Sequence, residues 1–162
     1  MDYHPTAYKI LELLKQNNCW YETFAHAPVR TSEEAAAIRT GYGLSQGVKA
    51  MIIKVKNTGG VGKFVMLALP GNLRFNNQKV KQALSVKEIR FATEAEIVEL
   101  TSGVQVGGVP PFGNLFGLEV LANPSIFDNE KIIFNAGDKR FSVAMRSEDY
   151  KRIVSPKVTE IT

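Results

Sequence analysis

The segment that most constrains the fold is residues 48–71, which reads VKAMIIKVKNTGGVGKFVMLALPG. Two runs rich in Val, Ile, Leu and Met flank the turn sequence NTGG. Such residues favour strands, and a short Gly-containing connection between two of these runs is typical of a β-hairpin. The sequence therefore predicts two antiparallel strands that pair with each other across this turn.

Helical patterns occur on both sides of the hairpin. The expected helices span residues 8–18, 31–43, 76–84, 93–100 and 147–154. Thr93 and Ser147 are predicted N-caps, because a side-chain oxygen in that position accepts a hydrogen bond from an unpaired backbone N–H. Glu96 stands where it would complete a capping box with Thr93.

Further segments have the alternation or the β-branched content of strands. They are residues 20–26, 88–92, 117–123, 130–137 and 140–146. Strands and helices follow one another too irregularly for a doubly wound parallel sheet. We therefore expect a mixed α+β fold, in which a mixed, partly barrel-like β-sheet is surrounded by helices.

Composition favours a single globular domain of residues 1–162. The chain is 44% hydrophobic and 22% charged, which suits one buried core, and Lys plus Arg exceed Asp plus Glu by 20 to 16, which permits an anionic partner. No apolar run approaches the ~20 residues of a membrane span, and the N-terminus does not resemble a signal peptide, so we expect a cytoplasmic protein with no membrane partner. With Cys19 the only cysteine and His4 and His26 the only histidines, neither a disulfide nor a metal site is expected.

Two catalytic motifs are incomplete. GGVGK at 59–63 resembles a phosphate-binding loop, but Asn57 and Phe64 stand where that motif needs Gly and Ser or Thr. No serine has glycine two residues away on both sides, so the nucleophile elbow of serine hydrolases is absent. His26, in HAPVRT, is either a strand-end histidine satisfied by a backbone hydrogen bond or a site residue, and a lone histidine favours the first interpretation.

Lys49 heads an apolar face of the first hairpin strand. A period of two places it on one face with Met51, Ile53 and Val55. An ammonium loses hydration among apolar side chains, so this lysine either extends to solvent at the strand end or meets an anionic ligand.

The stretch VGGVPPFG, residues 106–113, concentrates three glycines and two prolines. Gly107 and Gly108 lack Cβ atoms, so a substrate can approach their N–H groups, while Pro110 and Pro111 stiffen the loop. Such a loop can stabilise a developing oxyanion without reorganising during the reaction. A tight surface turn that merely links a helix to a strand is the alternative.

GGVPPFG resembles the Gly-x-x-x-Pro signature of the YbaK and prolyl-tRNA-synthetase editing-domain family, the aminoacyl-tRNA deacylases. The similarity extends, in the family's order and spacing, through HAPVRTSEEAA, GVKAMIIKVK, LPGNLRFNNQKVKQAL, IRFATEAEIVELTSGVQVGGVPPFG and IIFNAGDKRFSVAMRSEDYKRIV. The resemblance implies a compact α/β domain that hydrolyses the ester joining a wrong amino acid to the 3′ end of a tRNA, without a metal or other cofactor.

The resemblance also places the family's site residues on this chain. The implied catalytic residues are Lys49, Gly107 and Gly108, and the implied substrate-binding residues are His26, Ala50, Val109, Pro110, Pro111 and Gly137. The loop amides would hold the carbonyl oxygen, while Lys49 would anchor the terminal adenosine or add positive charge beside the oxyanion. A general-base role for Lys49 ranks second, because it requires a strongly lowered pKa.

Departures from the family pattern leave the substrate open. Ala50 replaces a polar residue common after the lysine, Pro110 replaces the usual Ser, and Ser142 stands where some relatives have an acid. Alanyl, cysteinyl, seryl and prolyl esters all remain candidates, because small apolar pockets discriminate by only ~1–3 kcal/mol per methylene.

The implied partner is a tRNA with an aminoacylated 3′ end, and an aminoacyl-tRNA synthetase is a further candidate. The chain has no synthetase core, so action in trans is expected, with phosphate contacts from basic side chains. Candidates for these contacts are Arg30, Lys54, Lys56, Arg74 and Lys139. Two rival functions are a catalytically inactive tRNA- or synthetase-binding module of the same fold and a hydrolase of another small acyl ester or amide.

Overall fold

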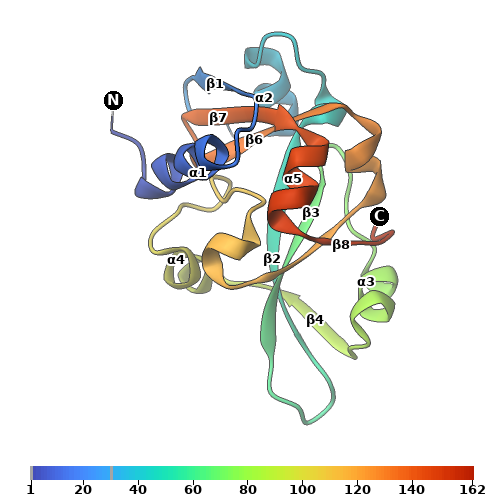
Figure 1. The fold of residues 1–162 in the computed structure, drawn as a ribbon. Coiled ribbons are helices and arrows are strands. Elements are labelled where there is room, and N and C mark those ends of the chain that lie inside the picture. The colour runs from blue at the N-terminus through green and yellow to red at the C-terminus, as the bar shows by residue number, and fades with distance from the viewer. Residues whose placement is uncertain (1, 30) are drawn as a thin grey trace.

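The computed structural model describes residues 2–29 and 31–162, which form α-helices, short 3-10 helices and strands (Figure 1). The α-helices are α1 (Pro5–Gln16), α2 (Ser32–Ile38), α3 (Asn77–Leu84), α4 (Glu94–Thr101) and α5 (Ser147–Val154). The strands are β1 (Tyr21–Ala25), β2 (Val48–Lys56), β3 (Lys63–Pro70), β4 (Glu88–Phe91), β5 (Glu119–Ala122), β6 (Lys131–Asp138), β7 (Phe141–Arg146) and β8 (Lys157–Val158). The 3-10 helices are η1 (Leu44–Gln46), η2 (Gly113–Phe116) and η3 (Pro124–Asp128).

The strands form two sheets. A three-stranded antiparallel sheet has the order β1, β7, β6, and a five-stranded sheet has the order β4, β2, β3, β5, β8. In the larger sheet β2 pairs antiparallel with β3 and β4, whereas β5 lies parallel to both β3 and β8. The prediction of a mixed sheet with helices around it is confirmed, but the sheets do not close into a barrel. Each sheet keeps its own edge strands, and the two meet at an isolated bridge between Gly47 and Ile133.

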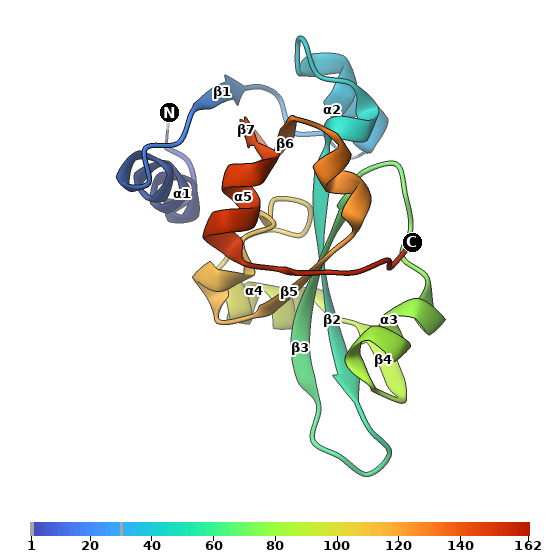
Figure 2. The same ribbon diagram turned by 45° about the vertical axis from the view of Figure 1, so that its right-hand side comes forward.

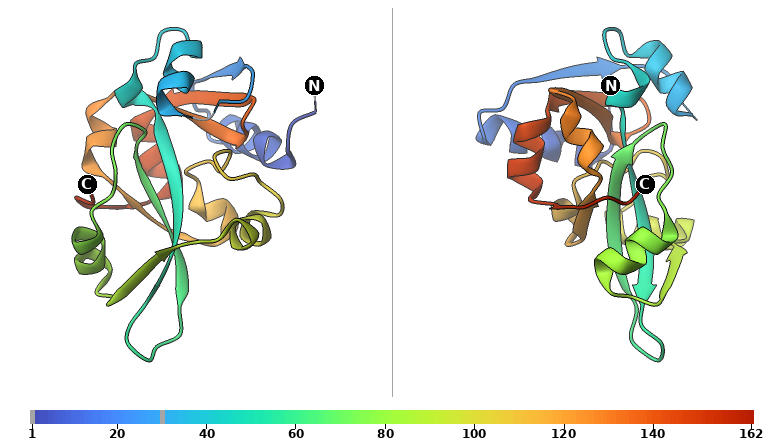
Figure 3. Two further views of the ribbon diagram at one scale, coloured as in Figure 1. Left: turned by 180° about the vertical axis from the view of Figure 1, so that it is seen from behind. Right: turned by 90° about the vertical axis from the view of Figure 1, so that its right-hand side faces the viewer.

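The hairpin predicted from residues 48–71 is confirmed. β2 and β3 run antiparallel, with Lys49 opposite Leu69 and Ala50 opposite Ala68. The connecting turn projects from the molecule at the end farthest from α2 (Figure 2). β4 and α3 flank this projecting half of the hairpin (Figure 3). Lys49 therefore lies at the opposite end of the hairpin, near α2.

Helix starts follow the predicted capping chemistry with one exception. Thr93 N donates to Glu96 Oε1 at 2.9 Å and Glu96 N donates to Thr93 Oγ1 at 3.2 Å, which confirms the capping box. The prediction that Ser147 is an N-cap is wrong, because α5 begins at Ser147 itself. The Ser147 hydroxyl instead donates to Asn129 O at 2.5 Å, so a tertiary partner replaces the local one. None of the described helices is long and apolar enough to cross a membrane.

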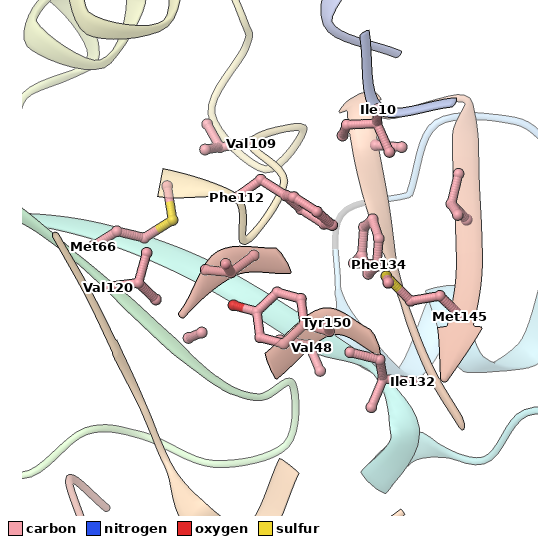
Figure 4. Packing of buried hydrophobic residues seen from close by; sticks show 14 of the residues in the cluster. Ile10, Val48, Met66, Val109, Phe112, Val120, Ile132, Phe134, Met145 and Tyr150 are labelled. Atoms are coloured by element: carbon pink, nitrogen blue, oxygen red, sulfur yellow. The ribbon is translucent and has the colours of Figure 1, made fainter. Parts of the chain in front are cut away.

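Apolar side chains cover both faces of the five-stranded sheet. The larger cluster lies between the two sheets, where Phe112 packs against Phe134 and Tyr150 with ring centroids 5.3 and 5.5 Å apart (Figure 4). The smaller cluster lies on the opposite face, around Ile53 and Val80. The middle of β2 is thus buried on both faces, by Ile52 on one side and Ile53 on the other, and this fixes the strand that begins at Val48.

Candidate active site

A cavity of about 250 Å³ lies beside the start of β2. Its walls come from α2 and the turn after it, β2, the loop between α4 and η2, and β6. The lining residues that matter here are Arg39, Lys49, Ala50, Gly107, Val109 and Asn135. None of the described residues that line it is Asp or Glu. The structure therefore brings Lys49 and part of the Gly/Pro loop together in a cavity whose fixed charges are positive.

Lys49 is half-buried at the cavity wall. Its Nζ donates to Gly71 O at 3.3 Å, which uses one of three ammonium donors. Burial lowers the pKa of Lys49 below its ordinary value of 10.5, the positive charge of Arg74 lowers it further, and Glu33 acts in the opposite direction. The side chain thus lies at the boundary between solvent and protein, with donors left for a ligand.

Gly107 is the exposed member of the glycine pair. Its φ of +90° is one that glycine adopts readily, and an added Cβ would come within 3.2 Å of Lys139 Cε. Its carbonyl accepts a hydrogen bond from Asn135 Nδ2 at 2.8 Å. Among the described residues its N–H has no hydrogen-bond partner. The loop is thus fixed at Gly107 while one amide donor stays available.

Both backbone groups of Gly108 form hydrogen bonds within the protein. Its N–H donates to Gln105 O at 2.9 Å, and its carbonyl accepts from Gly137 N at 2.8 Å. The residue is buried and does not line the cavity. In this conformation the Gly108 N–H is already used. Of the two amides predicted to contact the oxyanion, Gly107 is therefore the one that can donate.

Gly137 and the two prolines do not line the cavity. A Cβ at Gly137 would come 2.8 Å from Thr6 Cβ, so this glycine lets α1 pack closely on β6. Pro110 and Pro111 are buried, and Pro111 O accepts from Tyr150 Oη at 2.6 Å. Of the loop residues predicted to bind substrate, Val109 lines the cavity. Gly137 and the prolines hold the loop against the core.

His26 lies outside the cavity lining. Its Nδ1 is 2.8 Å from Ala27 O and its Nε2 is 2.7 Å from Ser142 Oγ. A carbonyl only accepts, so Nδ1 is the donor to Ala27 O. His26 therefore reaches the site only through Ser142.

Arg39 is the site residue that the sequence predictions missed. Its side chain is in the cavity wall although the residue is only 6% exposed. Its Nε donates to Ser142 Oγ at 3.1 Å and its Nη2 to Asn135 Oδ1 at 2.9 Å. Burial lowers the pKa of Arg39 to about 10. No local pattern marks Arg39 in the sequence, because its partners Ser142 and Asn135 are 103 and 96 positions away.

The basic residues predicted to contact tRNA divide into two groups. Lys54 lies 5.3 Å from the centre of the Phe64 ring and Lys56 pairs with Glu88 at 3.4 Å, both on the projecting half of the hairpin. Arg74 and Lys139 do not line the cavity but lie near residues that do: the charge of Arg74 acts on Lys49, and the Lys139 side chain is close to Gly107. Arg30 lies outside the described residues.

Metal ligands do not gather at this site. Across residues 2–29 and 31–162, no group of three His, Cys, Asp or Glu side chains could hold a metal ion. What the cavity offers is a backbone N–H, an amide side chain and two cations, which suit binding of an oxyanion or phosphate.

Comparison with known proteins agrees with this chemistry. The chain is 32% identical over 154 residues to the multifunctional Ser/Thr-tRNA deacylase ProXp-y of Escherichia coli (strain K12), with 94% of this chain and 90% of the relative covered. It is 28% identical over 119 residues to the proline–tRNA ligase of Ralstonia nicotianae, which covers 74% of this chain but 21% of the ligase.

Solved structures show the same fold. The crystal structure of a candidate trans-editing enzyme for prolyl tRNA synthetase superimposes with a TM-score of 0.80 at 20% identity, over 99% of both chains. Residues 26–153 match the family model described as the aminoacyl-tRNA editing domain. This match and the deacylase relative show that the chain belongs to the aminoacyl-tRNA editing-domain family.

Proposed function

We propose that this chain acts in trans to remove a wrongly attached small amino acid from tRNA, by hydrolysing the ester at the 3′-terminal adenosine. Its family makes it a hydrolase of aminoacyl-tRNA. The observation that carries the specific proposal is that Lys49 and Gly107 line the same cavity, which contains no acidic side chain among its described lining residues. The reaction would take place in the cytoplasm, where aminoacyl-tRNA is used.

An aminoacyl ester is already activated, so a positioned water and a stabilised oxyanion are sufficient for hydrolysis. We assign the Gly107 N–H, which has no partner among the described residues, as the donor to the ester carbonyl oxygen. The Lys49 ammonium, held by Gly71 O, adds positive charge beside this oxygen or anchors the terminal adenosine. No covalent intermediate on the protein is needed.

The substrate side chain would contact apolar residues such as Ala50 and Val109. The E. coli relative is named for Ser/Thr-tRNA, so seryl- and threonyl-tRNA are the first substrates to test. Alanyl, cysteinyl and prolyl esters belong in the same panel, because a small apolar wall separates them only weakly.

We assign phosphate contacts of the tRNA to Arg74 and Lys139, because these cations lie near residues that line the cavity. The similarity to part of a proline–tRNA ligase makes prolyl-tRNA synthetase the synthetase with which an association should be sought.

The test is deacylation of a panel of mischarged tRNAs by the wild type and by Lys49→Ala. We expect release of at least one small amino acid, and a loss of about 100-fold or more in the variant, which is the effect of removing one oxyanion donor. Lys63→Ala is the matched control, since Lys63 lies on the projecting half of the hairpin and pairs with Glu119.

Other outcomes would change the conclusion. Equal rates for the wild type and Lys49→Ala would remove Lys49 from the mechanism. Binding of tRNA with no release from any member of the panel would favour the inactive binding module. Hydrolysis of a minimal ester with no preference for tRNA would favour a different acyl-ester substrate.

A further inference from the structure

The Arg39 guanidinium is a buried cation whose hydrogen bonds within the described residues are all to neutral groups. Its hydrogen-bond acceptors are the Ser142 hydroxyl and the Asn135 amide oxygen, and burial is the influence that lowers its pKa. A buried charge is normally paired with an opposite charge, because removing it from water is costly. The part of the chain that the structure describes provides no carboxylate partner for Arg39.

One nitrogen of this guanidinium is open to the cavity. Nε and Nη2 are occupied, whereas Nη1 has no hydrogen-bond partner among the described residues. In that part of the chain, every side-chain nitrogen or oxygen that is fully buried has a hydrogen-bond partner. Because Nη1 has none, it is not fully buried. Because Arg39 lines the cavity, Nη1 is accessible to a ligand there.

The bonds to Ser142 and Asn135 fix the direction of the guanidinium. Asn135 also donates to Gly107 O at 2.8 Å, so one amide side chain connects Arg39 to the loop that carries the free Gly107 N–H. Two fixed nitrogens leave the planar group little freedom to turn. Nη1 and the Gly107 amide are thus held in one hydrogen-bonded unit on the cavity wall.

We propose that Arg39 is a substrate-binding residue whose Nη1 donates to a negatively charged oxygen of the substrate. The inference rests on the proposed function and extends it. Two oxygens of an aminoacyl-tRNA have this chemistry: the oxyanion that forms at the ester carbon, and a phosphate oxygen next to the terminal adenosine. In either position the substrate supplies the negative charge that the protein does not.

A purely structural role for Arg39 predicts a different result. Ser142 Oγ stays 2.7 Å from His26 Nε2, and Asn135 Nδ2 still donates to Gly107 O at 2.8 Å, so both side chains keep a hydrogen-bond partner when Arg39 is removed. Replacement of an unpaired buried cation by an apolar side chain of similar length should leave the fold as stable or more stable. A residue kept for structure would instead lower the melting temperature when replaced.

The experiment compares Arg39→Met and Arg39→Lys with the wild type on the tRNA ester that the wild type hydrolyses best. We expect Arg39→Met to lose about 10- to 100-fold in kcat/KM, the value of a hydrogen bond to a charged group, with a melting temperature at or above that of the wild type. Arg39→Lys should recover part of the rate. Arg146→Met is the control, because Arg146 pairs with Glu130 at the surface.

A second substrate distinguishes the two oxygens. On an aminoacyl-adenosine without phosphate, a persistent loss of kcat in Arg39→Met would identify the oxyanion, whereas disappearance of the defect would identify the phosphate. Wild-type rates for Arg39→Met on both substrates, or a loss explained by a lower fraction of folded protein, would overturn the inference while leaving the proposed function intact. A wild type that hydrolyses no member of the panel would overturn both.

Discussion

The cations at the two ends of the β2–β3 hairpin have different partners. Towards the projecting end, Lys56 pairs with Glu88 at 3.4 Å, and Lys63 with Glu119 at 3.5 Å. At the other end, Lys49 donates to a backbone carbonyl, and no Asp or Glu is among the described residues that line the adjoining cavity. Among the described residues, the same strand pair therefore has ion-paired lysines at one end and, at the other, a lysine without an ion pair.

The ion-paired lysines at the projecting end are surface charges, whereas the cations at the cavity are the ones for which we propose an anionic ligand. Exposed pairs contribute about 0–1 kcal/mol and are easily replaced. Cations withdrawn from water without a carboxylate lower stability, so their presence calls for a compensating anion. The substrate proposed above supplies this anion at the cavity end and has no role at the projecting end.

After Lys49→Ala, placing a carboxylate beside Arg39 should have the largest effect on activity. Ser142 is fully buried, with its Oγ 3.1 Å from Arg39 Nε, so Ser142→Asp would pair with the guanidinium and cancel its charge. We expect kcat/KM to fall about 10- to 100-fold, the value of a hydrogen bond to a charged group. Ser142→Asn has the same shape without the charge and should keep most of the activity. Equal losses in both variants, measured on equally folded protein, would show that size rather than charge is responsible.

The alkaline limb of the pH profile tests the charge on Lys49. Burial and Arg74 hold the pKa of Lys49 below 10.5, so a reaction that needs the ammonium should decline about tenfold per pH unit above this lowered pKa. Arg74→Ala removes one cause of the shift and should move the decline to higher pH. The measurement is kcat/KM against pH, corrected for spontaneous ester hydrolysis. A decline that stays in place in Arg74→Ala would contradict the assigned cause.

Deprotonation of Lys49 should raise the free energy of unfolding even though it lowers kcat/KM. In the window between the lowered pKa of folded Lys49 and 10.5, the unfolded chain binds more protons than the folded one. The free energy of unfolding contributed by this group therefore rises with pH across that window. The difference between wild type and Lys49→Ala in denaturant titrations isolates this contribution, and a difference that falls with pH would refute it.

Local patterns predicted the elements but only part of the site. The NTGG hairpin and the Thr93–Glu96 capping box depend on residues close in sequence, which is why they could be predicted. Lys49 and Gly107 were identified by face alternation and by missing Cβ atoms together with the family resemblance. The structure places both in the cavity lining.

The remainder of the site depends on contacts between distant residues. Arg39 reaches Ser142 across 103 positions, and Gly108 is tied to Gly137, so neither the added cation nor the occupied amide is visible in a local pattern. Pro110 and Pro111 restrict the backbone as Gly107 does, but both are buried and do not line the cavity, and Pro111 O accepts from Tyr150 Oη. Glycines and prolines identify this loop in the sequence. Which of its backbone groups are free to contact a ligand depends on tertiary packing, which the sequence does not show.

A smaller effect is expected from the cation beside Gly107. Lys139→Ala should raise KM for aminoacyl-tRNA a few-fold and reduce the slope of log KM against log salt by about 0.7, the value for one phosphate contact on a single strand. Lys56→Ala, whose lysine already pairs with Glu88, should leave both unchanged. If Lys56→Ala weakened binding as much as Lys139→Ala, the tRNA would contact the projecting half of the hairpin as well.

The smallest effect is expected where charge is already compensated. The Lys63 and Glu119 side chains are 63% and 47% exposed, so removal of the pair should change the free energy of unfolding by less than about 1 kcal/mol. A double-mutant cycle of Lys63→Ala and Glu119→Ala measures this coupling, and kcat/KM should stay at the wild-type value in all three variants. A coupling well above this limit, or a loss of activity, would mean that the projecting end of the hairpin affects the cavity end through the strands. Small values would instead confine the functional charge to the end of β2 that begins beside α2.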